Sequence, residues 1–166
     1  MVSRPLALGL RGFQFFCMLI VLALTANQVA MGGTPAIINY DLFTAIFAML
    51  SLIYLTAATL NESFIFHRAI MLGLDAFNLL FIFCAAVATA AILGSHSCSN
   101  GDYLKSNKIT LGSSKRCRES QASTAFLFFA LAAWIASTVF TFLDSRGSVN
   151  MRSGRSNPTM SQVSSA

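Results

Sequence analysis

Charged residues are scarce in this chain. They make up 10% of the 166 residues, whereas about a quarter of a soluble domain is charged. Hydrophobic residues make up 55%, and the mean hydropathy is +0.67. The scarcity of charge excludes an ordinary soluble globular domain, and the composition is that of an integral membrane protein.

The common signatures of enzymes are also missing. The sequence contains no glycine-rich phosphate loop, no G-x-S-x-G or H-E-x-x-H motif, and no facing pair of acids for general acid and base catalysis. His96 stands near Cys98, but no C-x-x-C or H-x-x-x-H partner follows them, so we expect no metal site and no cofactor. These absences favour a protein that is not an enzyme.

The apolar residues are gathered into four runs, each near the ~20 residues with which a helix crosses the hydrocarbon core. The runs cover residues 12–31, 42–60, 69–93 and 122–143. They are continuous rather than alternating, which predicts helices rather than strands of a barrel. The sequence therefore predicts an all-α membrane protein, with one four-transmembrane-helix bundle over residues 1–143.

A polar, basic island at residues 95–121 separates the last two runs, and Cys98 and Cys117 stand near its two ends. A disulfide between them would close a loop of 20 residues and contribute roughly 3 kcal/mol. Two unrelated free thiols are the alternative. Positive charges balance across the predicted topology, but cytosolic thiols stay reduced, so a disulfide places this loop outside the cell and both termini in the cytoplasm.

The C-terminal segment, residues 144–166, is rich in Ser, Gly and Arg and poor in apolar residues. This composition predicts a disordered cytoplasmic tail. Arg146, Arg152 and Arg155 would be attracted to the anionic inner leaflet by ~1 kcal/mol each.

Asp75 lies well inside the third run, about 10 Å from its inner end, where a carboxylate is costly and should face protein. Asn78 follows at i+3 on the same helix face, and Gln14, Thr56 and Thr59 are candidate partners at a similar depth. One interpretation is a proton or solute relay in a small transporter or channel. The other is a set of hydrogen bonds between helices, which we favour because the sequence offers a single deep acid and no intramembrane base.

The polar island also carries a family resemblance. Its motifs are His96-Ser97-Cys98-Ser99-Asn100, Ser106-Asn107-Lys108-Ile109-Thr110 and Arg116-Cys117-Arg118. Together with Leu74-Asp75 and Asn78 in the third run, they resemble the fungal non-classical export protein 2 family, which consists of MARVEL-domain proteins with four transmembrane spans. The resemblance covers the chain from the second run to the fourth and marks Asp75, Asn78, Cys98 and Cys117 as motif positions.

This resemblance implies a plasma-membrane protein of eisosomes and their furrow-like domains, which responds to sphingolipid status and works with eisosome coat proteins. A link to unconventional protein secretion is also implied. From the residues themselves we expect contacts with membrane lipids and none with nucleic acid. Small residues recur at four-residue spacing, as at Ala86 and Ala90, which fits close helix packing within one copy or in a homo-oligomer.

Overall fold

The computed structural model describes residues 4–33, 35–60 and 68–153, and in this part of the chain the regular structure is helical throughout. The helices are α1 (Arg4–Ala30), α2 (Ala36–Leu60), α3 (Arg68–Leu93), α4 (Gly101–Ser106) and α5 (Ser114–Ser153). Four of them, all except the short α4, are long and apolar enough to cross a membrane. The predicted all-α bundle of four transmembrane helices is confirmed.

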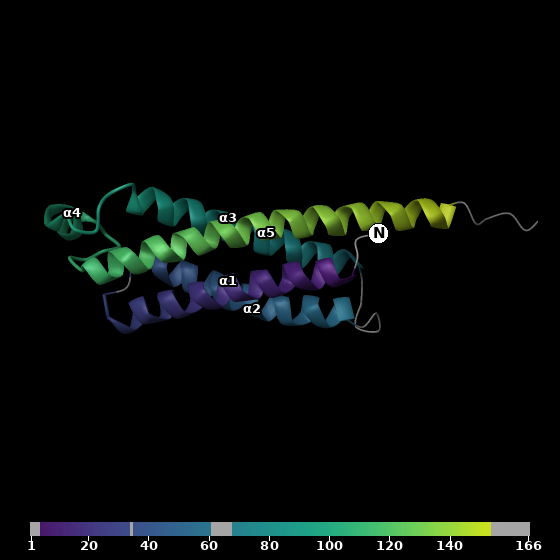
Figure 1. The fold of residues 1–166 in the computed structure, drawn as a ribbon, viewed down its shortest axis with the longest axis horizontal. Helices are drawn as coiled ribbons and strands as arrows, with labels where there is room; N and C mark the ends of the chain where they lie inside the picture. Colours follow the sequence, from purple (N-terminus) through teal and green to yellow (C-terminus); the bar gives the residue numbers. More distant parts are fainter. Residues whose placement is uncertain (1–3, 34, 61–67, 154–166) are drawn as a thin grey trace, which may run out of the picture.

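The four long helices lie side by side and form a four-sided bundle (Figure 1). α1 packs against α2 and α5, and α3 packs against the same two helices, so the order around the bundle is α1, α2, α3, α5. α1 and α3 therefore lie diagonally opposite each other. α4 sits at one end of the bundle. α1 begins at the other end, where α5 runs on beyond the other long helices.

Small side chains fill much of the space between the helices. The alanines of the core are Ala45 and Ala48 of α2, Ala85 and Ala86 of α3, and Ala130 of α5. Small residues let helices approach closely, which is the main source of packing energy where lipid has removed the hydrophobic effect between helices. Larger residues such as Met18, Leu127 and Trp134 fill the remaining space and are fully buried.

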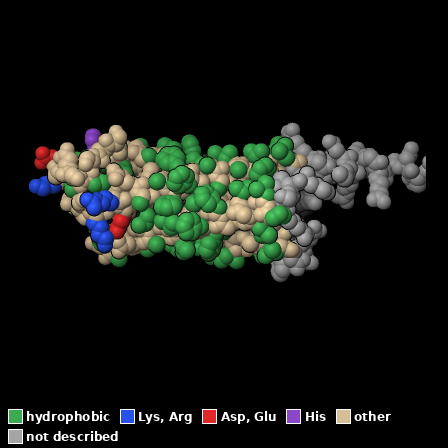
Figure 2. Space-filling view, viewed as in Figure 1, with side chains coloured by type: hydrophobic (Ala, Val, Ile, Leu, Met, Phe, Trp, Pro, Cys, Tyr) green, Lys and Arg blue, Asp and Glu red, His purple; other side chains and the backbone are tan. Residues whose placement is uncertain are grey.

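The outer surface of the bundle is apolar. Figure 2 shows hydrophobic side chains over the middle of the molecule and charged side chains gathered at the end that carries α4. Large side chains such as Phe16, Leu50, Phe77 and Phe129 are more than half exposed. An apolar exterior around a core that contains polar groups is the pattern expected of a helix bundle in lipid.

Three of the four spanning helices begin earlier than the apolar runs predicted. α1 begins at Arg4 rather than at residue 12, α2 at Ala36 rather than 42, and α5 at Ser114 rather than 122. The loop predicted at 95–121 therefore loses its last eight residues to α5. Arg11 and Asp41 are the charged residues directly before two of the predicted spans. The helices nevertheless include them, because each is buried with a partner.

The prediction of a disordered tail is wrong for residues 144–153, where the backbone continues α5. Extending an existing helix needs no new nucleus, and this segment contains no proline, so its polar composition alone does not end the helix. Arg146 and Arg152 lie on this extension, whereas Arg155 lies outside the described residues. Their attraction to the inner leaflet stays a prediction.

Candidate functional site

Arg11 of α1 and Asp75 of α3 form an ion pair inside the bundle. Arg11 Nη1 donates to Asp75 Oδ1 at 2.6 Å, and Nη2 donates to Oδ2 at 2.7 Å. The two side chains are only 5% and 0% exposed. Each residue is seven positions from the start of its helix, or about 10 Å into the bundle. The pair therefore joins two diagonally opposite helices through the middle of the bundle.

Gln14 extends this ion pair to a third helix. Its Oε1 accepts from Arg11 Nη1 at 3.3 Å, and its Nε2 donates to the Ala133 carbonyl of α5 at 3.1 Å. We call Arg11, Gln14 and Asp75 the Arg11 cluster. It links α1, α3 and α5, and it balances charge internally, which is the arrangement that makes ionised groups tolerable in a membrane interior.

The Arg11 cluster corrects the sequence analysis on one point. The expectation that no intramembrane base accompanies Asp75 is wrong, because Arg11 lies at the same depth and binds both carboxylate oxygens. Among the candidate partners, Gln14 belongs to the cluster, whereas Thr59 donates to the Leu55 carbonyl of its own helix at 2.7 Å. The sequence analysis did not pair Arg11 with Asp75, because Arg11 stands directly before the apolar run that was predicted to begin at residue 12.

Asn78, the second residue of the predicted polar cluster, is buried one turn beyond Asp75. Its amide nitrogen donates to the Leu74 carbonyl at 2.8 Å. Its Oδ1 has no hydrogen-bond partner in the part of the chain that the structure describes. Asn78 thus shares the inward face of α3 with Asp75 but bonds to its own helix.

The expectation of a single deep acid is also wrong, because Asp41 of α2 is a second buried acid. It lies toward the end of the bundle that carries α4. The Thr89 hydroxyl of α3 donates to Asp41 Oδ2 at 2.8 Å, and both side chains are fully buried. The other oxygen, Oδ1, and the hydroxyl of Thr44 one turn further along α2 are without partners among the described residues. The sequence did signal this site, because Ile37 and Ile38 precede Asp41 and extend the apolar run on its other side.

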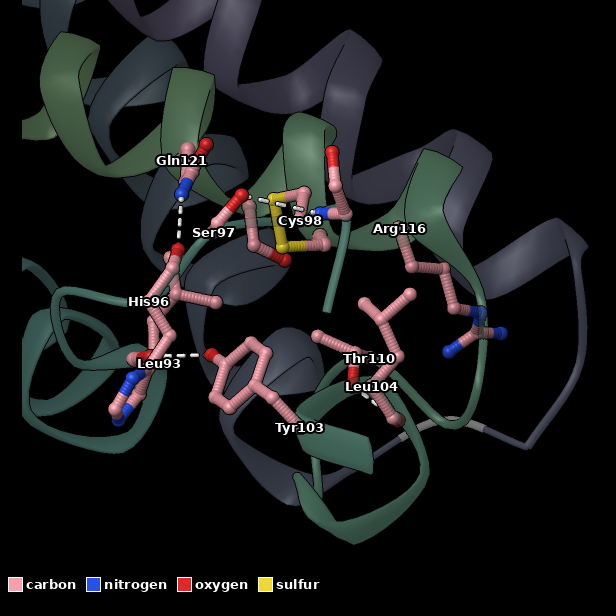
Figure 3. Close-up of a disulfide and its surroundings, with 12 residues drawn as sticks. Leu93, His96, Ser97, Cys98, Tyr103, Leu104, Thr110, Arg116 and Gln121 are labelled. Carbon is pink, nitrogen blue, oxygen red and sulfur yellow. Dashed lines mark hydrogen bonds between the residues drawn. A yellow bond between two sulfur atoms is a disulfide. The ribbon is translucent and has the colours of Figure 1, made fainter. Parts of the chain in front are cut away.

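A disulfide joins Cys98 to Cys117, as predicted, with the two Cα atoms 5.6 Å apart (Figure 3). It fastens residues 95–113, which we call the cap, to the beginning of α5. Tyr103 and Leu104 pack against it, and the Gln121 side chain donates to the His96 carbonyl at 3.2 Å. The cap thus has a small core of its own, built around the disulfide. Its position outside the cell stays a prediction.

The cap also closes the end of α3. The Tyr103 hydroxyl donates to the Leu93 carbonyl, and Asn107 Nδ2 donates to the Ile92 carbonyl at 2.7 Å. Such bonds satisfy carbonyls that a helix end leaves without partners. Burial raises the pKa of Tyr103 above its usual value, so the hydroxyl keeps its proton and its role as a donor further into the alkaline range.

Arg116, in the first turn of α5, closes the end of α1 in a similar way. Its Nη2 donates to the Gln28 carbonyl at 3.0 Å and also to the Gly32 carbonyl. A cation at a helix C-terminus binds the last carbonyls and interacts favourably with the helix dipole. Nearby, Asn27 Nδ2 donates to Glu119 Oε1 at 2.6 Å. The end of α1 and the beginning of α5 are therefore held together by several polar contacts.

Comparison with known proteins gives a consistent assignment. Residues 4–140 match the MARVEL membrane-associating domain. The chain is 42% identical to non-classical export protein 102 of Candida albicans, an alignment that covers 95% of this chain and 99% of the relative. It is 30% identical to the non-classical export protein 2 homolog of Schizosaccharomyces pombe, over 78% of this chain and 72% of that one.

A shorter match, 43% identical over 43% of this chain and 42% of the relative, is to non-classical export protein 2 of Saccharomyces cerevisiae. No solved structure matches the chain. The domain match spans the four long helices, and the match to the Candida relative runs nearly end to end. This chain is therefore a multi-pass membrane protein that belongs to the MARVEL membrane-associating domain family and, within it, to the non-classical export protein 2 family.

Proposed function

We propose that this protein is a non-enzymatic organiser of the plasma membrane, which gathers lipids and coat proteins into furrow-like domains of the eisosome type and responds to sphingolipid status. The observation that carries this proposal is the contrast between an interior that encloses the ion pair of Arg11 and Asp75 and an apolar exterior that faces lipid. In a protein built this way, the surfaces available for binding are the lipid-facing sides and the two polar ends.

The hydrogen bonds of Asp75 favour an organiser over a transporter or channel component that uses this residue. A carboxylate that carries a proton or solute needs a free oxygen in at least one state. Both oxygens of Asp75 are occupied by Arg11, and Arg11 is in turn held by Gln14. The cluster thus supports a role in holding three helices together.

The end of the bundle away from the cap is suited to binding a coat protein. α5 continues ten residues beyond Leu143, where its span ends, which corresponds to about 15 Å of helix. This extension lies at the same end as the beginning of α1 (Figure 1). With Arg146 and Arg152 on it, the extension would meet the anionic inner leaflet and leave a helical surface for a partner.

A second candidate is a role in unconventional protein secretion. The observation that favours it is the name shared by the relatives, which refers to non-classical export. The amount of a leaderless cargo protein in the medium, compared between cells with and without this protein, tests it. Unchanged secretion together with lost membrane patches would favour the organiser.

Imaging of a fluorescently tagged chain during a block of sphingolipid synthesis tests the main proposal. We expect patches at the cell surface that redistribute when synthesis stops. A chain that lacks residues 144–166 is expected to reach the surface but to lose its patches. A uniform distribution that ignores the block would contradict the proposal, and solute flux through the parent protein in liposomes would favour the transporter.

A further inference from the structure

A pocket of about 420 Å³ opens at the end of the bundle that carries the cap. Its lining residues are Met31, Gly32, Leu111, Ser113 and Arg116. Met31 directly follows α1, and Ser113 directly precedes α5. The pocket therefore lies where two membrane-spanning helices reach their polar ends on the cap side, which is where we expect the lipid headgroups of that leaflet.

Arg116 gives this pocket a positive charge without a balancing anion. The side chain is only 3% exposed, and its Nη1 has no hydrogen-bond partner among the described residues. In the same part of the chain no carboxylate lies within ion-pair distance of Arg116; the nearby Glu119 pairs with Lys115 at 3.8 Å. A buried cation without an anion is costly, so the site favours a negatively charged ligand. In Figure 3 the Arg116 side chain points away from the disulfide.

The beginning of α5 adds to this preference. Arg116 lies in the first turn of the helix, where backbone N–H groups and the helix dipole attract anions. Three further cations of the cap and first turn of α5 are exposed to solvent and raise the positive potential around the pocket: Lys105, Lys108 and Lys115.

The rim of the pocket is apolar. Leu111 is 50% exposed and Met31 is 38% exposed. Leu111 also has a φ of +47°, in the left-handed region that leucine rarely adopts. Its Cδ1 lies so close to Gly33 that a Cβ there would be 3.3 Å away. A glycine at residue 111 would avoid the backbone strain. The presence of leucine at this position indicates that its apolar side chain has a role at the rim of the pocket.

We propose that this pocket binds a phosphate-bearing membrane lipid, with the phosphate at Arg116 and the apolar part next to the headgroup against Leu111 and Met31. The volume is within the range of small-molecule sites. Free phosphate would bind Arg116 but would make no contact with the apolar rim. A neutral glycolipid would contact the rim but would not bind Arg116. The inference deepens the lipid response in the proposed function and rests on that function for its biological meaning.

The test measures binding of fluorescent phosphatidylinositol to the purified full-length chain in a neutral detergent. Arg116→Gln removes the charge, and we expect about tenfold weaker binding. Arg118→Gln is the matched control, because it removes an exposed cation two residues further on, and it should bind as the parent does. Inorganic phosphate and a neutral glycolipid, each added as competitor, should displace the labelled lipid poorly.

Arg116 also holds the end of α1, so Arg116→Gln changes the fold as well as the charge of the pocket. Leu111→Gly is the variant that separates binding from folding. Glycine suits a positive φ, so the thermal midpoint should rise or stay unchanged while lipid affinity falls about fivefold. Unchanged affinity in both Leu111→Gly and Arg116→Gln overturns the proposal. Full displacement by inorganic phosphate overturns it in favour of a free-anion site, and equal competition by the glycolipid shows an apolar site without headgroup selection.

Two separate measurements, lipid binding by the purified protein and surface patches of the parent in cells, keep this inference distinct from the proposed function. Lipid binding in the purified protein decides the pocket, whatever the cells show. If the parent binds the lipid but forms no surface patches, the pocket stands and the organiser function fails. If the parent forms patches but lipid binding does not depend on Leu111 or Arg116, the function stands and the pocket fails.

Discussion

Asp75→Asn is the sharpest test of the Arg11 cluster. Asparagine keeps the shape of the side chain but removes the charge that balances Arg11, which is 5% exposed. Two unit charges about 4 Å apart interact by about 4 kcal/mol at an effective dielectric constant of 20. Removing one partner of a buried pair costs roughly 3–5 kcal/mol, because the other charge stays buried without compensation. We expect Asp75→Asn to lower the free energy of unfolding by an amount in this range.

The single tryptophan of the chain provides the readout. Trp134 is fully buried and follows Ala133, whose carbonyl accepts from Gln14 of the cluster. Unfolding of the purified protein by increasing mole fractions of SDS should therefore change the Trp134 emission. Asp102→Asn makes the same chemical change at an exposed position of α4, and it should stay within about 0.5 kcal/mol of the parent.

A double variant completes the test. Arg11→Met combined with Asp75→Leu leaves no unpaired charge, so its stability should recover much of what Asp75→Asn loses. An Asp75→Asn protein that unfolds at the same SDS fraction as the parent would refute the reasoning. So would a double variant whose loss equals the sum of the two single losses, since independent residues behave in that way.

Three further predictions concern the rest of the chain. On intact cells, a membrane-impermeant reductant should expose Cys98 and Cys117 to a thiol label, and labelling without the reductant would contradict the disulfide. Thr89→Val removes the donor to Asp41 and should cost about 1–3 kcal/mol in the SDS assay. Thr124→Val, which loses only a bond to its own helix, is the control, and equal losses would refute the contact. Because burial raises the pKa of Tyr103, its contribution to stability is full below the ordinary tyrosine pKa of about 10 and is lost as the pH rises through the higher folded value. Tyr103→Phe should remove that part of the alkaline slope, measured by thermal unfolding, and an unchanged slope would count against it.

The sequence predicted the elements whose signals are local. Four continuous apolar runs determine four spans, and two cysteines around a polar segment determine a disulfide, because each signal can be read without knowing what packs against it. Asp75 could be expected to face protein for the same reason, since a carboxylate at that depth is costly in lipid.

The partners of the buried charges could not be predicted in this way. Arg11 meets Asp75 across 64 residues of sequence, and the contact depends on how two diagonally opposite helices are rotated in the bundle. A span that is predicted from hydropathy also stops at a charged residue. The predicted spans therefore left Arg11 and Asp41 outside their helices. The helical extension of α5 was missed because a polar composition was read without the helix that precedes it.

The ion pair between Arg11 and Asp75 also sets an order for biosynthesis. Ribosomes add about 5–20 residues per second, so Asp75 follows Arg11 by roughly 3–13 s. During that interval α1 carries an arginine with no carboxylate to bind, and an arginine in this state reaches toward the nearer membrane surface. We therefore expect α1 to lie nearer that surface until α3 is inserted and supplies Asp75. The charge of Arg11 is thus balanced only after the third span has been made, so a chain that ends before α3 would keep an unpaired arginine in its first helix.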